Sequence, residues 1–272
     1  MRELLRHREV LLNLVRKENK VKYKSTVLGV AWSMVYPALY LAVFYMVFTL
    51  LRSGLPNFVV YLLAGVVPWT LFSTGLAGAT GSVVANASLV TKVAFPREIL
   101  PLSGIGAPLV NFFYQFAVLL LFLLVFGYSF FGPALLLVPM AVLVLLLFLA
   151  AVGLATSALN VKYRDVRHLV DLALLAWFWA TPVVYAGPQL VAEKLGPGAL
   201  QLYLLNPVTN IVLSFQRALY GGTSPQALAA LPNPGIAWYA GRLAAVGAVS
   251  LALLYVTWRI FYRMSGDFAE EL

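Results

Sequence analysis

The sequence predicts an all-α integral membrane protein with six transmembrane helices, and three observations lead to this fold class. Of the 272 residues, 62% are hydrophobic and only 11% are charged, whereas soluble domains carry about 25% charged residues. One stretch of 39 residues, from Ser53 to Thr91, has no charged side chain, and a second of 63 runs from Ile99 to Val161. Uncharged runs well above ~18 residues are typical of membrane-spanning helices. The runs lack the alternation of β-barrel strands.

The first 24 residues are expected to form an amphipathic helix that lies in the cytoplasmic membrane interface. They hold eight of the 19 basic residues. On a helix with 100° per residue, four apolar residues fall on one side, and Arg16 and Lys20 fall opposite. Glu18 intrudes on the apolar side, and a solvated basic tail is the alternative. The four apolar residues are Leu4, Leu11, Leu14 and Val15.

Six apolar segments between residues 27 and 262 are expected to form the transmembrane domain. Glycine and proline in "GYSFFGP" divide the 63-residue run into two spans. The charged segment "NVKYRDVRH" separates the fourth span from the fifth. The expected spans are residues 27–51, 58–82, 104–126, 134–159, 169–186 and 236–262.

The segment between the fifth and sixth spans, residues 187–235, is interrupted too often for a continuous helix. Its 22 uncharged residues between Lys194 and Arg217 are long enough to cross a membrane. Breakers at this density favour short re-entrant or interfacial helices, at about residues 187–220. The breakers are Gly196, Pro197, Gly198, Asn206 and Pro207.

The basic residues predict the orientation of the spans. With the N-terminus in the cytoplasm, the expected cytoplasmic segments hold 15 basic residues and the expected outer segments hold four. This asymmetry follows the positive-inside rule. It places both termini in the cytoplasm, with residues 263–272 as a cytoplasmic tail.

The stretch "NASLVTKVAFPREILP", residues 86–101, is expected to be a cytoplasmic loop between the second and third spans. Pro96 and Pro101 are expected to bound a short helix, and "FPRE" to end one helix and start another. The alternative is a plain basic loop that only sets topology. An apolar face of the loop argues against this alternative, because apolar side chains are unfavourable in water. A cytoplasmic partner could bind this face. This face consists of Leu89, Val90, Val93 and Phe95.

The chain lacks the residues of several kinds of chemistry. There is no cysteine and no GxxxxGK[ST] phosphate loop, and His7 and His168 are too few for a metal cluster. None of the ten acidic residues lies at the expected mid-membrane depth, where ion-coupled transporters usually bury a carboxylate. Energy for uphill transport must therefore come from outside the chain.

Aromatic residues in the expected spans form a candidate sugar-conducting surface, because rings with polar tips stack on sugar faces. Tyr36 and Tyr40 lie one turn apart beside Pro37, and Phe44 follows them. Trp69 lies in the second span. Interfacial belts or ordinary helix packing are the alternative for each ring.

Several motifs, in order along most of the chain, resemble one family. "YKSTVLGVAWSMVYPALYLAVFYMVF" and "YLLAGVVPWTLFS" resemble the first two spans of permease subunits of polysaccharide ABC exporters, type 2 ABC transporter permeases. The stretch "KVAFPRE", the Y-R-D element, "TPVVY" and "LNPVTNI" are similar to later parts of that family. Each motif alone is weak, and the ordered set is strong.

The resemblance implies a homodimer in the bacterial cytoplasmic (inner) membrane, with two copies of a separate ATPase subunit that bind ATP and Mg. It implies export of a polysaccharide on an undecaprenyl diphosphate lipid, such as O antigen or teichoic acid. Neither a cofactor on this chain nor a nucleic-acid partner is expected. Residues 86–98 would form the coupling helix, and residues 187–220 would form re-entrant gate helices.

With this family in view, particular residues are expected to have particular roles. The coupling contacts would be Leu89, Val90, Lys92, Phe95, Arg97 and Glu98. The contacts to the lipid diphosphate would be Arg16, Lys17, Lys20 and Lys22. The glycan channel would be lined by Tyr36, Tyr40, Phe44 and Trp69.

Three alternative functions stay open at this point. An exporter of a small drug or lipid belongs to the same superfamily. A membrane-embedded glycosyltransferase needs a carboxylate or metal cluster at the membrane surface, and only Asp165 and Asp171 come close. A structural scaffold does not account for the aromatic residues.

Overall fold

The computed structural model describes residues 8–23, 55–93 and 95–272, together with seven single residues between 32 and 46. This described part is all-helical and contains no strand. The expected first span, residues 27–51, therefore lies almost wholly outside it. The helices are α2 (Arg8–Tyr23), α4 (Phe58–Ala85), α5 (Ala87–Lys92), α6 (Ile99–Val125), η2 (Pro133–Leu136), α7 (Leu137–Lys162), α8 (Val166–Trp179), α9 (Gly187–Tyr203), α10 (Pro207–Leu219), α11 (Pro225–Ala229), α12 (Ile236–Met264) and α13 (Phe268–Glu271).

Four of these helices are long and apolar enough to cross a membrane: α4, α6, η2 with α7, and α12. At 1.5 Å per residue, each is about 40 Å long, which exceeds the ~30 Å hydrocarbon core of a bilayer. They coincide within a few residues with the expected second, third, fourth and sixth spans. The prediction of long apolar helices is confirmed for these segments, which are candidate membrane spans.

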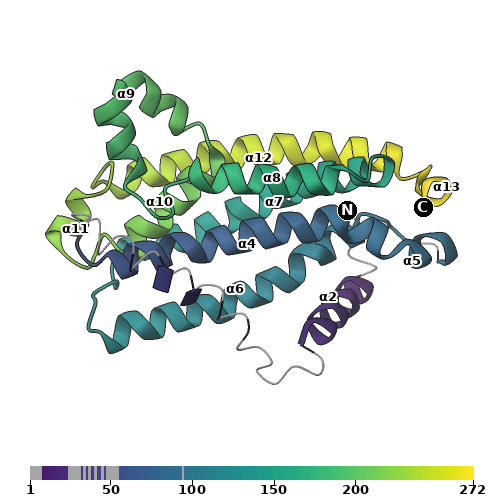
Figure 1. The fold of residues 1–272 in the computed structure, drawn as a ribbon, viewed down its shortest axis with the longest axis horizontal. Helices are drawn as coiled ribbons and strands as arrows, with labels where there is room; N and C mark the ends of the chain where they lie inside the picture. The colour runs from purple at the N-terminus through teal and green to yellow at the C-terminus, as the bar shows by residue number, and fades with distance from the viewer. Residues whose placement is uncertain are drawn as a thin grey trace.

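The long helices run side by side in one elongated bundle (Figure 1). Helix α4 is central, because it packs against α6, α7, α8 and α10. Helix α12 packs on α7, and the short helix α2 packs on α6. The short helices α9, α10 and α11 gather at one end of the bundle, and α5 and α13 lie at the other (Figure 1).

The contact between α4 and α6 requires glycine on both helices. A Cβ atom added at Gly78 would lie 2.5 Å from the carbonyl oxygen of Gly104, and one added at Gly104 would lie 2.6 Å from that of Gly78. Backbones that approach this closely leave no room for a side chain. Small residues at such crossings are typical of helices packed in membranes.

Helix α8 is shorter than the fifth span expected from the sequence. It ends at Trp179, after 14 residues or about 21 Å, rather than at residue 186. Pro182 disfavours helical geometry at Thr181, and the "TPVVY" residues form turns instead. These turns are held by Tyr61, whose hydroxyl lies 3.3 Å from the Pro182 carbonyl oxygen and 2.8 Å from that of Tyr185.

The segment after α8 forms the short helices that the breakers predict. Helix α9 is kinked at Gly196, whose positive φ of 85° precedes Pro197. Asn206 caps α10, because its side chain accepts a hydrogen bond from the backbone N–H of Val208 and Pro207 occupies the first turn. Almost every residue of α10 is buried, so this helix fills the end of the bundle between α4, α7 and α12.

Candidate functional site

The loop between α4 and α6 lies at the α5 end of the bundle (Figure 1). Asn86 separates α4 from α5, and Val93 is extended with φ −129° and ψ 131°. Helix α6 then begins at Ile99, so the "FPRE" corner does start a helix. The short helix precedes Pro96, however, and does not lie between the two prolines. Pro101 is the third residue of α6, where its missing N–H costs no helical hydrogen bond.

A small apolar cluster, here named the end cluster, holds this loop against segments from both ends of the chain. Phe261 of α12 and Phe268 of α13 contact edge to face, with ring centroids 5.4 Å apart. Arg97 Nη1 donates a hydrogen bond to the Gly266 carbonyl oxygen at 3.4 Å. The expected C-terminal tail thus packs onto the loop. The buried members of the end cluster are Leu14, Val83, Val90, Ile99, Leu100, Leu154, Ala158, Val161, Phe261 and Phe268.

The expected coupling residues divide between the interior and the surface. Val90 is 4% exposed and belongs to the end cluster, so its side chain contacts this chain itself. Leu89 and Phe95 are partly buried against the same cluster. Glu98, which precedes α6, is also buried. Lys92 is exposed and Arg97 is partly buried.

An apolar pocket of about 460 Å³ opens between α2 and the α5 loop. Val93, whose side chain is 53% exposed, forms part of its wall. Sequence reasoning missed the contribution of α2, although Val10, Leu14 and Lys17 recur at the i, i+4, i+7 spacing of one helix face. The lining residues are Val10, Asn13, Leu14, Lys17, Leu89, Val93 and Phe95.

Helix α2 is amphipathic in the predicted sense. Leu14 is buried, and Arg16 and Lys20 are exposed. Lys17 Nζ donates a hydrogen bond to Asn86 Oδ1 at 3.3 Å. Lys22 belongs to the helix, but its side chain is outside the described structure. The expected diphosphate contacts therefore lie on a helix that directly touches the α4–α5 junction.

Glu18 is the acidic residue that intrudes on the apolar side of α2, and the structure places it partly inside the protein. Burial raises the pKa of its carboxyl above the ordinary value of 4.5. The positive charge of Lys17 and a hydrogen bond with Ser103 on α6 lower the pKa, but burial is the larger effect.

Of the four expected channel residues, Tyr36, Tyr40 and Phe44 lie outside the described residues. Trp69 is 3% exposed in this single chain. Its ring centroid lies 5.6 Å from that of Phe72 and 5.5 Å from that of Phe178 on α8. A role for Trp69 in the channel stays a prediction.

Asn160 of the "NVKYRDVRH" segment and Asn206 of the "LNPVTNI" motif both have structural roles. Asn160 Nδ2 donates to the Thr80 carbonyl oxygen at 3.1 Å, and Asn160 Oδ1 accepts from the Arg167 N–H at 3.1 Å. This side chain thereby joins α7 to α4 and α8. Asn206 Oδ1 accepts from Trp177 Nε1 at 2.9 Å, and its Nδ2 donates to the Ala180 carbonyl oxygen at 3.0 Å. These motif positions hold the bundle together.

Within the described ranges, no group of three or more His, Cys, Asp or Glu side chains is placed to hold a metal ion. The arrangement at the α5 end is one of apolar contacts, a basic helix and a pocket. Such a surface can offer apolar contacts to a partner protein and basic contacts to an anionic ligand.

Residues 9–220 match the ABC-2 type transporter family. The chain is 33% identical to an O-antigen export system permease protein RfbA of Myxococcus xanthus over 275 aligned residues, which cover 100% of this chain and 98% of the relative. It is 31% identical to a protein of the same name from Klebsiella pneumoniae, over 79% of this chain and 82% of the relative. A further Klebsiella pneumoniae protein of that name is 29% identical over 79% of this chain and 81% of the relative.

Proposed function

The chain belongs to the ABC-2 type transporter family as a permease subunit of a type 2 ABC exporter, and from this premise we propose that it forms the membrane pathway for a lipid-linked polysaccharide. The single observation that carries the substrate class is the 33% identity over the whole chain to a relative named for O-antigen export. The undecaprenyl diphosphate carrier is part of the proposal.

The proposed assembly is a homodimer of six-span chains in the bacterial cytoplasmic membrane, with both termini in the cytoplasm. The 15 to 4 distribution of basic residues supports this orientation. An exposed apolar stripe on α8 supports a second copy, because its residues recur at helical spacing. The stripe consists of Leu169, Leu172, Leu175 and Trp179, which are 56–65% exposed.

Two copies of an ATPase subunit, with ATP and Mg bound, would supply the energy. The α5 loop is the proposed coupling contact. Val93 supports this, because it is an exposed apolar side chain beside a pocket that Phe95 also lines. In this arrangement Val90 holds the loop to its own chain, and Val93 and Phe95 face the ATPase. Helices α9 and α10 are the proposed re-entrant gate.

Export of a small drug or lipid is the second candidate function. The apolar pocket of about 460 Å³ favours it, because drug-sized ligands occupy cavities of roughly 300–1,000 Å³. A membrane-embedded glycosyltransferase is less well supported. The described residues offer it no metal cluster.

The coupling part of the proposal is tested by co-purification of the permease with its ATPase. Val93→Asp is expected to weaken the complex at least tenfold, since a charge in an apolar contact costs several kcal/mol. The fold should survive, because Val93 is exposed. Thr91→Asp is the matched control, on an exposed α5 residue outside the pocket. Equal ATPase recovery from both variants would contradict the coupling assignment.

The substrate part is tested separately by export in cells. Deletion of this chain should leave lipid-linked polysaccharide in the cytoplasmic leaflet, and mass spectrometry of the purified transporter should find that lipid bound. Retention of a small amphiphile and no glycan would favour the second candidate.

The homodimer is tested by cysteine cross-linking, which is clean because the chain has no native cysteine. Leu172→Cys or Leu175→Cys should form an intermolecular disulfide under oxidation. Leu251→Cys, an equally exposed position on α12, serves as the control. Cross-linking from α12 alone would place the dimer contact elsewhere.

A further inference from the structure

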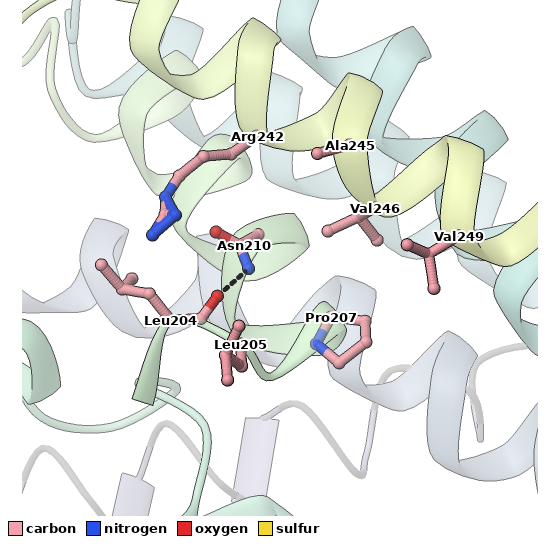
Figure 2. A pocket seen from close by; sticks show the side chains of 8 residues that line it. All are labelled: Leu204, Leu205, Pro207, Asn210, Arg242, Ala245, Val246 and Val249. Atoms are coloured by element: carbon pink, nitrogen blue, oxygen red, sulfur yellow. Dashed lines mark hydrogen bonds between the residues drawn. The ribbon is translucent and has the colours of Figure 1, made fainter. Parts of the chain in front are cut away.

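A second pocket lies between α10 and α12, near the end of the bundle that carries α9 and α11 (Figure 1). Its volume is about 190 Å³. The side chains of Leu205 and Val249 are 73% and 66% exposed, so the pocket opens to the outside of the chain. The lining residues are Leu204, Leu205, Pro207, Asn210, Arg242, Ala245, Val246 and Val249 (Figure 2).

Asn210 brings an unsatisfied hydrogen-bond acceptor to this pocket. Its side chain is 4% exposed. The amide orientation is fixed, because Nδ2 donates to the carbonyl oxygens of Leu204 at 2.8 Å and of Asn206 at 3.0 Å. The remaining Oδ1 atom is buried and has no partner among the described residues. A buried acceptor without a partner is costly, so a ligand that donates a hydrogen bond here is favoured.

Arg242 brings a cationic side chain with one unsatisfied N–H group to the same pocket. Its Cζ atom lies 4.7 Å above the centroid of the Trp238 ring, and its Nε atom is buried without a hydrogen-bond partner in the described structure. Neither α10 nor α12 contains an acidic residue that could neutralise it. Figure 2 shows the guanidinium extending from α12 toward α10, with the Asn210 oxygen on the side that faces it.

The apolar part of the pocket continues along one face of α12. Ala245, Val246 and Val249 follow Arg242 at the i+3, i+4 and i+7 spacing of a helical stripe. Arg242 is the seventh residue of α12, about 9 Å from its first residue, and Val249 lies about 10 Å further along. The charge is therefore near the end of a spanning helix, and the apolar stripe runs toward its middle. This order matches a lipid whose headgroup lies at the interface.

From these three observations we infer that the pocket between α10 and α12 binds an anionic glycerophospholipid with a hydroxyl-bearing headgroup, of which phosphatidylglycerol is the simplest. The phosphate accepts from Arg242 Nε–H, and a headgroup hydroxyl donates to Asn210 Oδ1. An acyl chain lies along Val246 and Val249. The inference goes beyond the transport function, because this lipid stays in place and tethers α10 to α12.

A membrane phospholipid fits the pocket better than the transported diphosphate lipid does. The pocket offers one cation and one acceptor, which match one phosphodiester and one hydroxyl. A diphosphate carries at least one more negative charge, and the lining contains no second basic residue for it.

The test is lipid binding to the full chain in detergent, measured by native mass spectrometry with three lipids of equal acyl chains. Phosphatidylglycerol should bind about tenfold more tightly than zwitterionic phosphatidylcholine. It should bind about threefold more tightly than phosphatidylethanol, which has the same charge but no headgroup hydroxyl. The second comparison tests the Asn210 contact without a mutation, so it does not depend on whether an Asn210 variant folds.

Variants then locate the site. Arg242→Gln should abolish the preference for phosphatidylglycerol over phosphatidylcholine, and Arg242→Lys should retain part of it. Val249→Trp should weaken the binding of all three lipids. Arg259→Gln is the matched control, because Arg259 lies near the other end of α12 and stacks on Tyr255 with a Cζ-to-centroid distance of 5.0 Å. It should leave these preferences unchanged.

Three results would overturn the inference. The first is equal affinity for the three lipids. The second is loss of the phosphatidylglycerol preference in Arg259→Gln as much as in Arg242→Gln. The third is displacement of phosphatidylglycerol by an equimolar polyprenyl diphosphate in the wild-type chain, which would assign the pocket to the transported lipid.

Discussion

Lys17 Nζ donates a hydrogen bond to Asn86 Oδ1 across a distance of 3.3 Å. Asn86 is the residue at which α4 gives way to α5, and its own Nδ2 donates to the Ser82 carbonyl oxygen at 2.9 Å. One basic residue of α2 thus contacts the segment proposed to engage the ATPase. An anionic headgroup that draws Lys17 away would change the contacts of the coupling loop. Under the proposed function, this pair would link substrate capture to ATP hydrolysis.

Substitution of Lys17 is expected to have two effects where substitution of Lys20 has one. Each basic residue near an anionic headgroup contributes about 1 kcal/mol, or about fivefold in affinity. Lys20→Met should therefore raise the substrate concentration for half-maximal ATP hydrolysis about fivefold. Lys17→Met should do the same and also lower the melting temperature, because the contact with Asn86 is lost. Asn86→Ala should lower the melting temperature alone. Identical behaviour of Lys17→Met and Lys20→Met would show that the contact has no role.

The packing of α2 is expected to weaken as pH rises above about 4.5. The pKa of Glu18 is raised by burial, so the folded protein binds a proton in a pH range where the unpacked helix has lost it. Stability then falls as pH rises through that range. Glu18→Gln should flatten the dependence of the melting temperature on pH above about 4.5. Glu9→Gln, at an exposed position of the same helix, should not. Parallel pH profiles of wild type and Glu18→Gln would contradict this.

The glycine contact between α4 and α6 is expected to tolerate no methyl group. Gly104→Ala places a Cβ 2.6 Å from the Gly78 carbonyl oxygen and 2.7 Å from its carbonyl carbon. Since backbone atoms cannot yield as side chains do, we expect a loss of about 1–3 kcal/mol or more. The measurement is thermal unfolding in detergent. Gly241→Ala is the control, because its added Cβ meets nothing within 4 Å beyond its chain neighbours and the nearby backbone of its own helix, and it should be neutral or stabilising by up to about 1 kcal/mol. Equal melting temperatures would refute the close contact.

Local signals in the sequence were sufficient for the long helices. The charge-free runs and the "GYSFFGP" break predicted α4, α6, α7 and α12 to within a few residues. The fifth span was wrong in its extent, because its apolar character continues past Trp179, whereas helical geometry is disfavoured for the residue before Pro182. Hydropathy indicates whether a segment is stable in a membrane. The end of this helix depends instead on the Thr181–Pro182 pair, which hydropathy does not detect.

The candidate sites could be predicted only in part, because they depend on contacts between distant segments. The apolar loop and the basic helix were visible separately, but nothing in their patterns places Lys17 beside Asn86. The same holds for Arg97 and Gly266, which are 169 residues apart. From the sequence, Arg242 was only one of the basic residues that predict the orientation of the spans. Its position in one pocket with Asn210 follows from the packing of α10 on α12.

The last prediction concerns the glycan channel. Tyr36 and Tyr40 are expected to face it, because a tyrosine hydroxyl that faces hydrocarbon without a partner costs roughly 2–7 kcal/mol. Trp69 is buried against Phe178 of α8, with ring centroids 5.5 Å apart. It can reach a channel if α8 moves away from α4. The nucleotide state of the ATPase should therefore control its accessibility.

Cysteine labelling with a water-soluble maleimide separates these cases, because the chain has no native cysteine. Single cysteines at positions 36 and 40 should react when the ATPase is locked with ATP. Cysteine at position 69 should react only in that state and be protected without nucleotide. Val60, which is fully buried on α4, is the control position and should stay protected in both states. If positions 36, 40 and 69 react in no state with the water-soluble reagent but do react with a lipid-soluble one, the rings face the bilayer, and the channel runs along other residues.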